Sequence, residues 1–260
     1  MRRYGTAPFG VAVVHGGPGA GGGMAPVARR LARQRGVLEP IQTADSLKGQ
    51  VEELTAVLES EGGVPVTLIG FSWGAWLSFI VAARRSPTVK KLVLVGSGPY
   101  LDEYAARIRE TRLARLSEEE KSRFEAVVSA LSDPATQDKD SLLEQLGALT
   151  FKTDAYDPIA DESGDCGALP VDGDVFQAVS KDAAETRRSG ELLALAARIE
   201  CPVLAIHGDH DPHPAEGVSG PLSALLRDFR FVLRKSCGHK PWIERHAREE
   251  FYRILDEELC

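Results

Sequence analysis

Short runs of apolar residues alternate along the chain with longer stretches in which apolar residues recur every three or four positions. Several of the short runs are nearly unbroken in valine, isoleucine and leucine, which is typical of parallel strands covered on both faces. The expected strands are Gly10–His15, Val37–Gln42, Val64–Gly70, Lys91–Gly96, Val203–His207 and Phe229–Leu233. The expected helices are Met24–Arg35, Leu47–Ser60, Trp73–Arg85, Glu191–Arg198, Pro221–Arg227 and Ile243–Glu258. This alternation predicts an α/β fold with a doubly wound, mostly parallel sheet.

One long segment interrupts the alternation. From about Leu101 to Gly190 helical patterns continue without a convincing strand. The helices expected there are Leu101–Leu116, Glu118–Leu131, Ser141–Leu149 and Asp174–Arg188, and the Asp-, Gly- and Pro-rich stretch Thr153–Asp174 is expected to be irregular. We therefore expect residues 1–98 and 191–260 to form a core domain. Residues 99–190, called the inserted segment below, are expected to form a helical cap on it.

The composition is that of an ordinary globular protein. Of the 260 residues, 43% are apolar and 27% are charged, and no apolar run approaches the length of a membrane-spanning helix. The four cysteines (Cys166, Cys201, Cys237 and Cys260) lie far apart, form no C-x-x-C motif and are interpreted as free thiols. With no apolar stretch typical of a signal peptide near the N-terminus, these features predict a cytoplasmic protein without a membrane partner. The net charge of −7 argues against nucleic acid as a partner.

The negative charge is concentrated in the inserted segment. Residues 99–190 hold 20 acidic and 11 basic residues, whereas the rest of the chain holds 18 acidic and 20 basic residues. Two interpretations follow. The acidic residues are either a solvated surface of the helices or a negative field over a pocket, which would favour cationic or amine substrates.

A sharp strand-to-helix turn is indicated by Gly70-Phe-Ser72-Trp-Gly74, a G-x-S-x-G motif between an expected strand and an expected helix. A serine at the tip of such a turn has strained backbone angles and crowded neighbours two residues away on either side. Glycines at 70 and 74 remove the Cβ atoms that would clash. Since the serine also begins a helix, whose N–H groups favour negative charge, we expect Ser72 to be a nucleophile rather than an incidental serine.

A nucleophilic serine needs a general base, and the base needs an acid that orients it. The expected strand Val203–His207 runs into a turn that contains Asp209 and Asp211. His239 is the only one of the six histidines that lies between the last expected strand and the terminal helix. Ser72, an aspartate of the turn and His239 therefore form a candidate catalytic triad.

Four short motifs occur in order, each at the end of an expected strand. They are H-G-G-P-G at His15–Gly19, G-x-S-x-G at Gly70–Gly74, G-x-x-D at Gly208–Asp211 and G-H at Gly238–His239. In these motifs the chain resembles the α/β-hydrolase superfamily, and the resemblance covers the chain outside the inserted segment. It implies a triad of Ser72, Asp211 and His239, because the family's acid usually lies three residues after the glycine. It also implies an oxyanion hole formed by the backbone N–H groups of Gly17 and Trp73.

The glycine-rich loop admits a second interpretation. Gly17–Gly22 matches G-x-G-x-x-G, lies between an expected strand and an expected helix, and is followed at a suitable distance by Glu39, as in a dinucleotide-binding unit. The resemblance favours the oxyanion loop, and the absence of G-K-[ST] excludes a Walker-type phosphate loop. A non-catalytic or nucleotide-binding protein on the same sheet stays open as the alternative of another class.

Neither a metal nor a cofactor is expected. The residues that suggest a metal cluster are His207, Asp209, His210, Asp211 and His213. They alternate so tightly along one loop that we do not expect them to converge on one ion. Cys237, close to His239, is expected to be a buried filler rather than a nucleophile.

The H-G-G-P-G and G-x-S-W-G motifs together resemble the proline iminopeptidase branch, whose members recognise a free amine through acids of the lid. The chain departs from that branch because "LEPIQTADSLKGQ" stands where the branch has D-x-R-G-x-G-x-S, and because few residues precede the first strand. We therefore expect a small-molecule esterase or amidase, with an iminopeptidase-like aminopeptidase as the alternative. The oligomeric state and the identity of the substrate stay open.

Overall fold

A single seven-stranded sheet forms the centre of the molecule. The computed structural model describes residues 1–159 and 167–259. The strands are β1 (Arg2–Tyr4), β2 (Val11–Val14), β3 (Val37–Glu39), β4 (Val66–Phe71), β5 (Val89–Val95), β6 (Val203–Gly208) and β7 (Phe229–Arg234), in the spatial order β1-β3-β2-β4-β5-β6-β7. In the described ranges β1 alone pairs antiparallel, with β3, and the other neighbours are parallel. The predicted doubly wound α/β sheet is confirmed.

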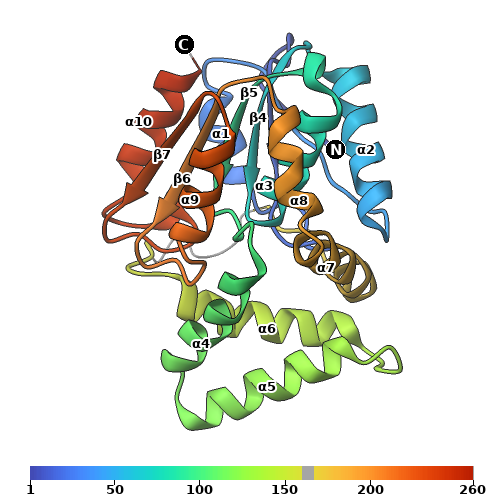
Figure 1. Ribbon diagram of the computed structural model, residues 1–260, viewed down its shortest axis with the longest axis vertical. Coiled ribbons are helices and arrows are strands. Elements are labelled where there is room, and N and C mark those ends of the chain that lie inside the picture. Colours follow the sequence, from blue (N-terminus) through green and yellow to red (C-terminus); the bar gives the residue numbers. More distant parts are fainter. Residues whose placement is uncertain (160–166, 260) are drawn as a thin grey trace.

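Helices cover both faces of this sheet (Figure 1). One face packs against α1 (Ala25–Leu31) and α10 (Arg248–Glu258). The other face packs against α2 (Leu47–Glu61), α3 (Trp73–Arg84), α8 (Glu191–Ala194) and α9 (Glu216–Leu225). None of the helices in the described ranges is long and apolar enough to cross a membrane.

The central elements are nearly or wholly buried, which explains their apolar sequences. All six residues of β4 and eleven of the twelve residues of α3 are buried. A strand covered on both faces has no polar side to alternate with, so its apolar run is continuous. Because β4 lies at the centre of the sheet and α3 packs against its face, the turn that joins them at Ser72 is held on both sides by the core.

The inserted segment is helical throughout its regular part. Between β5 and β6 lie α4 (Ala105–Ala114), α5 (Glu118–Ser132), α6 (Lys139–Asp154) and α7 (Gly173–Arg188). In Figure 1, α4, α5 and α6 form a layer at one end of the molecule, and α7 lies between this layer and the core. The four predicted helices of the segment are present, while the boundaries of the core domain and the cap, at residues 98–99 and 190–191, stay a prediction.

Several predicted ends differ from the structure. The three-residue β1 was too short to show a pattern, and α9 begins at Glu216 rather than Pro221 because burial of Val218 and Leu222 holds the helix on both sides of the proline. The last predicted helix, Ile243–Glu258, begins at Arg248 instead, because the backbone of Glu244 after the turn Pro241–Ile243 is extended. The predicted free thiols Cys166 and Cys260 lie outside the described residues, whereas Cys201 and Cys237 are unpaired.

Candidate active site

Ser72 lies in a strained turn between β4 and α3. Its φ of 52° and ψ of −114° are unusual for a residue with a side chain. A Cβ on Gly70 would lie 2.2 Å from the carbonyl oxygen of Gly74, and a Cβ on Gly74 would lie 2.4 Å from that of Val14. Both contacts are too close for any side chain, so the glycines of the motif are required by the packing around Ser72.

The structure brings the three predicted triad residues together from three different loops. The Oγ atom of Ser72 lies 3.0 Å from Nε2 of His239, in the loop after β7. Nδ1 of the same ring lies 2.7 Å from Oδ2 of Asp211, in the turn after β6. Because parallel strands end at the same edge of a sheet, side chains that follow β4, β6 and β7 meet there.

The two aspartates of the turn after β6 have different partners. Asp211 accepts hydrogen bonds from histidines, whereas Oδ1 of Asp209 accepts the backbone N–H of Cys237 at 3.3 Å and Oδ2 of Asp209 lies 3.6 Å from Nζ of Lys235. The side chain of Asp211 is fully buried and that of Asp209 is partly exposed. The geometry therefore favours Asp211 as the acid that orients His239.

The electrostatics of Asp211 favour its ionised form. Burial raises the pKa of this carboxyl, but the neighbouring His239, His213 and His207 rings outweigh burial and hold the pKa well below its usual value. An ionised carboxylate only accepts hydrogen bonds, so Nδ1 of His239 carries a proton and donates it. In the neutral ring Nε2 then accepts the hydrogen bond of the Ser72 hydroxyl, which is the arrangement that a general base requires.

Two further histidines, both from the loop of the suggested metal cluster, contact the Asp211 region. Nδ1 of His213 lies 2.7 Å from Oδ1 of Asp211, and Nε2 of His207 donates to the carbonyl oxygen of His213 at 2.8 Å. Asp209 and His210 point elsewhere, the latter against the ring of Tyr156. The sequence pattern G-D-H-D-P-H-P indicated that histidines lie close to the acid, but it did not show which of them face Asp211.

One nitrogen or oxygen atom from each of Asp211, His213 and His239 lies within 4.8 Å of the others, so the group could hold a metal ion. Its spacing argues for hydrogen bonds instead. Each imidazole nitrogen is 2.7 Å from a carboxylate oxygen, whereas tetrahedral ligands about 2.1 Å from a zinc ion lie roughly 3.4 Å apart. The cluster is therefore interpreted as one carboxylate that binds two imidazoles through shared protons.

The loop after β2 lies directly against Ser72. A Cβ on Gly16 would be 3.0 Å from the Cβ of Ser72, and Gly17 has a φ of +66°. The His15 ring, fully buried beneath this loop, contacts the carbonyl oxygen of Gly16 through Nδ1 and accepts the backbone N–H of Gln42 through Nε2. Burial lowers the pKa of His15 more than the backbone contacts with Gly16 and Gly17 raise it, so the ring is neutral at neutral pH.

The other glycines of this loop are explained by contacts with the inserted segment. A Cβ on Gly19 would lie 2.1 Å from the carbonyl oxygen of Asp172, and a Cβ on Gly22 would lie 2.1 Å from that of Gly167. The carbonyl oxygens of Gly19 and Gly21 accept the N–H groups of Asp172 and Leu169 at 2.8 and 2.9 Å. Protein backbone therefore occupies the side of the loop on which a dinucleotide motif would need free space.

Glu39, the acid of the dinucleotide interpretation, is likewise engaged within the protein. Its side chain is fully buried, accepts the hydroxyl of Tyr4 at 2.8 Å and lies 3.5 Å from the guanidinium of Arg2. A carboxylate that binds a ribose must reach solvent at the edge of the sheet. The surroundings of Glu39 do not fit that role.

A pocket opens beside Ser72 between the core and the inserted segment. Its volume is about 200 Å³. The core contributes Pro18, Ser72, Trp73, Trp76, Gly98 and His213, and the inserted segment contributes Pro99, Ile108, Ser180, Ala183, Ala184 and Arg187. Most of these side chains are apolar, and the permanently charged one is Arg187, whose Nε atom donates to Asp102 at 3.0 Å and whose guanidinium lies over the Trp76 ring.

Cys237 does not take part in this pocket. It is fully buried, and its Sγ atom lies 3.4 Å from the carbonyl oxygen of Gly238. Burial raises the pKa of the thiol, and the nearby Glu244 and Asp211 raise it further. A thiol that stays protonated is a poor nucleophile, which fits the expected role as a filler.

Glu244 is a site residue that the sequence analysis missed. Its fully buried carboxylate accepts the backbone N–H groups of Gly238, Tyr156 and Asp157 at 3.0, 2.9 and 2.8 Å. It thus ties the end of α6 to the loop that carries His239. An acid just before a helix is a common pattern, so no local signal distinguished this one.

Comparison with known proteins places these features in a family. The family model described as alpha/beta hydrolase fold matches residues 11–245. No curated protein matches the chain.

Solved structures agree with this match at the level of the fold. The chain is similar to VinJ, with 20% identity, a TM-score of 0.70 and coverage of 99% of this chain and 93% of that one. An alpha/beta fold family hydrolase from Bacillus anthracis str. Sterne has 16% identity, a TM-score of 0.69 and coverage of 98% and 93%. Proline iminopeptidase from Mycobacterium smegmatis has 19% identity, a TM-score of 0.63 and coverage of 98% and 91%.

Proposed function

This chain belongs to the alpha/beta hydrolase fold family, and from that premise we propose that it is a serine hydrolase that cleaves an ester or amide bond of a small molecule. The observation that carries the proposal is the continuous line of hydrogen-bonding atoms from Ser72 through His239 to Asp211, with separations of 3.0 and 2.7 Å. Nucleophile, base and orienting acid are thus within reach of one another before a substrate binds.

In the proposed reaction, Nε2 of His239 takes the proton of the Ser72 hydroxyl while Oγ attacks the carbonyl carbon of the substrate. The imidazolium then gives this proton to the leaving alcohol or amine, and an acyl-enzyme on Ser72 remains. A water molecule, deprotonated by the same ring, attacks the acyl carbon and releases the acid. Asp211 stays ionised throughout and stabilises the imidazolium.

The negative oxygen that forms at each attack needs hydrogen-bond donors. We assign these donors to the backbone N–H groups of Gly17 and Trp73, as the motifs imply. Among the described residues neither group is used in another hydrogen bond, and Trp73 opens α3, where N–H groups lack partners within the helix. Each such donor lowers the barrier by about 3 kcal/mol.

The pocket supports a small, largely apolar acyl group. Its volume of about 200 Å³ is below the range typical of drug-sized ligands, and Trp73 and Trp76 line it. An aminopeptidase would need a carboxylate near Ser72 for the substrate amine. The residues that line the pocket in the described part of the chain include no acid, so an esterase or amidase is the better supported form of the proposal.

The proposal is tested by labelling with a fluorophosphonate, which reacts with an activated serine whatever the natural substrate. We expect one adduct per chain, which mass spectrometry of the digested protein places on the peptide with Ser72. Ser72→Ala should abolish labelling, whereas Ser180→Ala, which removes another serine of the pocket, should retain it. An adduct on a different residue, or no adduct in folded protein, would contradict the proposal.

A further inference from the structure

The His213 ring is held rigidly against the other residues of the site. Prolines at positions 212 and 214 flank it and restrict the backbone on both sides. Its backbone N–H donates to Oδ1 of Asp211 at 2.9 Å, and its Nδ1 lies 2.7 Å from the same oxygen. The ring stacks on His239 with centroids 4.5 Å apart and an angle of 22° between the planes.

The distribution of protons follows from these contacts. Ionised Asp211 can only accept, so both Nδ1 atoms that face it carry protons, that of His213 at Oδ1 and that of His239 at Oδ2. One carboxylate is thus shared between two imidazoles. The proposed reaction uses only the bond from His239 to Asp211, and the bond from His213 has no role in it.

We propose that His213 is a positioning residue: by donating to Oδ1 it fixes the plane of the Asp211 carboxylate and limits how strongly that carboxylate holds a proton on His239. This inference rests on the proposed function. A hydrogen bond draws electron density from the carboxylate, so less attraction remains for the imidazolium of His239. Asp211 therefore stabilises the imidazolium of His239 less than it would without this donor.

The surroundings keep His213 neutral, as this role requires. The titratable and charged groups that face it come from several elements. They are His207 on β6, Asp211 in the turn after β6, His239 after β7, Arg112 on α4, Asp154 at the end of α6, and Arg187 across the pocket on α7. Burial lowers the pKa of His213, and although Asp211 raises it, His239 and Arg112 lower it again. A proton gained in acid would place a second cation against His239 and would oppose catalysis.

Two substitutions separate the hydrogen bond from the packing of the ring. His213→Phe keeps a flat ring for the stack and loses the donor, whereas the amide nitrogen of His213→Asn can replace Nδ1 but cannot take up a proton. His246→Gln is the matched control, because His246 is 55% exposed and pairs with Asp157 away from the triad. Thermal unfolding and circular dichroism of each variant show whether it folds.

The pH dependence of kcat/KM on a neutral ester is the first measurement. We expect His213→Phe to move the acid limb to higher pH by roughly half a unit to one unit, because a hydrogen bond to a charged group is lost. His213→Asn and His246→Gln should keep the acid limb of the unmodified protein. An unmoved acid limb in His213→Phe, or the same shift in His213→Phe and His213→Asn, would overturn the proposal.

A titration followed by NMR of ¹⁵N-labelled histidine tests the inference without turnover, and it uses the unmodified protein should a variant fail to fold. We expect a protonated Nδ1 and an unprotonated Nε2 on His213 at neutral pH, together with a strongly downfield proton at Nδ1. The opposite tautomer would overturn the proposal. Because this reading is independent of fluorophosphonate labelling, failure of His213 in its role and failure of the serine hydrolase assignment give different results.

Discussion

Asp211 is the residue at which most of the side-chain contacts of the site meet. It is fully buried, yet both of its oxygens are bound, Oδ1 by His213 and Oδ2 by His239. Asp209, two residues earlier, is also near the loop after β7, but it accepts the backbone N–H of Cys237 and pairs with Lys235. Two acids of one turn thus have separate tasks, and substitution should distinguish them.

We expect Asp211→Asn to lower kcat by several orders of magnitude, up to about 10⁴-fold, because an amide favours the wrong tautomer of His239. Asp209→Asn should lower it far less, since Asp209 does not touch the base. Steady-state kinetics of both variants, with unfolding curves to confirm the fold, check this prediction. A larger loss in Asp209→Asn would reassign the acid.

The sequence could predict the residues that carry local signals but not those whose roles arise from distant contacts. Ser72 lies in a motif whose glycines are required by the turn, His239 follows from its position after the last strand, and the family resemblance selected Asp211 over Asp209. Glu244 became visible only when segments about 90 residues apart met. For His213, the pattern G-D-H-D-P-H-P placed histidines near the acid, but only the folded loop shows that this ring contacts Asp211.

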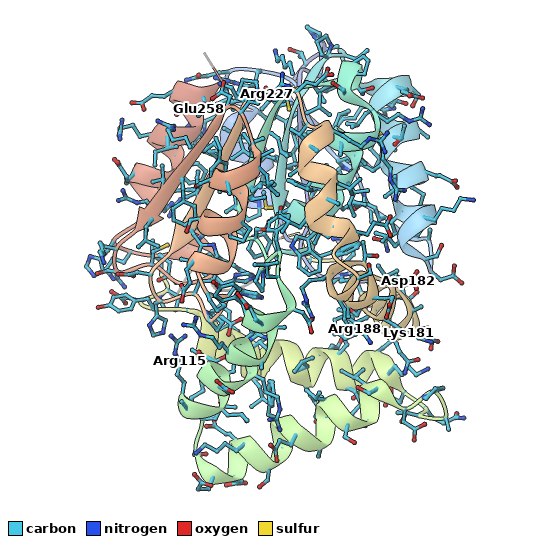
Figure 2. The ribbon with its side chains drawn as sticks, viewed as in Figure 1. Arg115, Lys181, Asp182, Arg188, Arg227 and Glu258 are labelled. Atoms are coloured by element: carbon cyan, nitrogen blue, oxygen red, sulfur yellow. The ribbon has the colours of Figure 1, made fainter. Side chains whose placement is uncertain are left out.

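At the scale of elements, the end of α6 connects the inserted segment to His239, the proposed general base. Arg112 of α4 binds both carboxylate oxygens of Asp154 at 3.0 and 2.6 Å, and the carbonyl oxygen of Asp154 accepts the N–H of His239 at 2.8 Å. Arg115 donates to the carbonyl oxygens of Thr153 and His210, and Figure 2 shows it at the junction of α4 with the core. The position of His239 therefore depends on helices outside the sheet.

A double-mutant cycle on Arg112→Ala and Asp154→Ala tests this connection. We expect a coupling of about 1–3 kcal/mol in unfolding free energy, because the pair is bidentate and largely buried, and a loss of about tenfold in kcat because His239 is less well placed. The control pair Arg109 and Glu125, exposed on α4 and α5, should give less than about 1 kcal/mol and leave kcat unchanged. Equal couplings in both cycles would contradict the prediction.

Long elements were predicted more accurately than short ones and ends. The helices α2, α5 and α7 have enough turns for a periodic pattern, and each was placed within a residue or two. β1 has three residues, and the break before α10 depends on Glu244, whose carboxylate accepts backbone donors more than 80 residues away. Tertiary contacts of this kind decide where a helix begins, and no local window contains them.

At the scale of the whole molecule, the acidic residues of the inserted segment and the pocket lie in different places. Acids of α5 and α7 pair with basic neighbours at the surface, as in Glu120 with Lys152 and Asp174 with Lys139. The pocket wall instead holds Arg187. This distribution favours the interpretation of the acids as a solvated surface over an attractive field for amines.

Matched neutral, cationic and anionic esters decide between the two interpretations. We expect the anionic ester to be preferred to the cationic one by about two- to fivefold in kcat/KM, since Arg187 is partly neutralised by Asp102, and we expect salt to weaken this preference. Arg187→Gln should remove the preference. Lys181→Gln, at an exposed position of α7 that does not line the pocket (Figure 2), should keep it. A preference for the cationic ester would instead support the interpretation of the acids as a negative field that attracts amines.

The contact between the glycine-rich loop and residues 167–172 has a consequence for how the molecule is assembled. These two backbones are hydrogen-bonded to each other although they are roughly 150 residues apart in the chain. Because the contact closes a very long loop, we expect it to form late in folding. The sheet and its helices can be complete while the loop beside Ser72 is still unsupported. During refolding we therefore expect helical structure to recover before turnover does, because the loop beside Ser72 is ordered last.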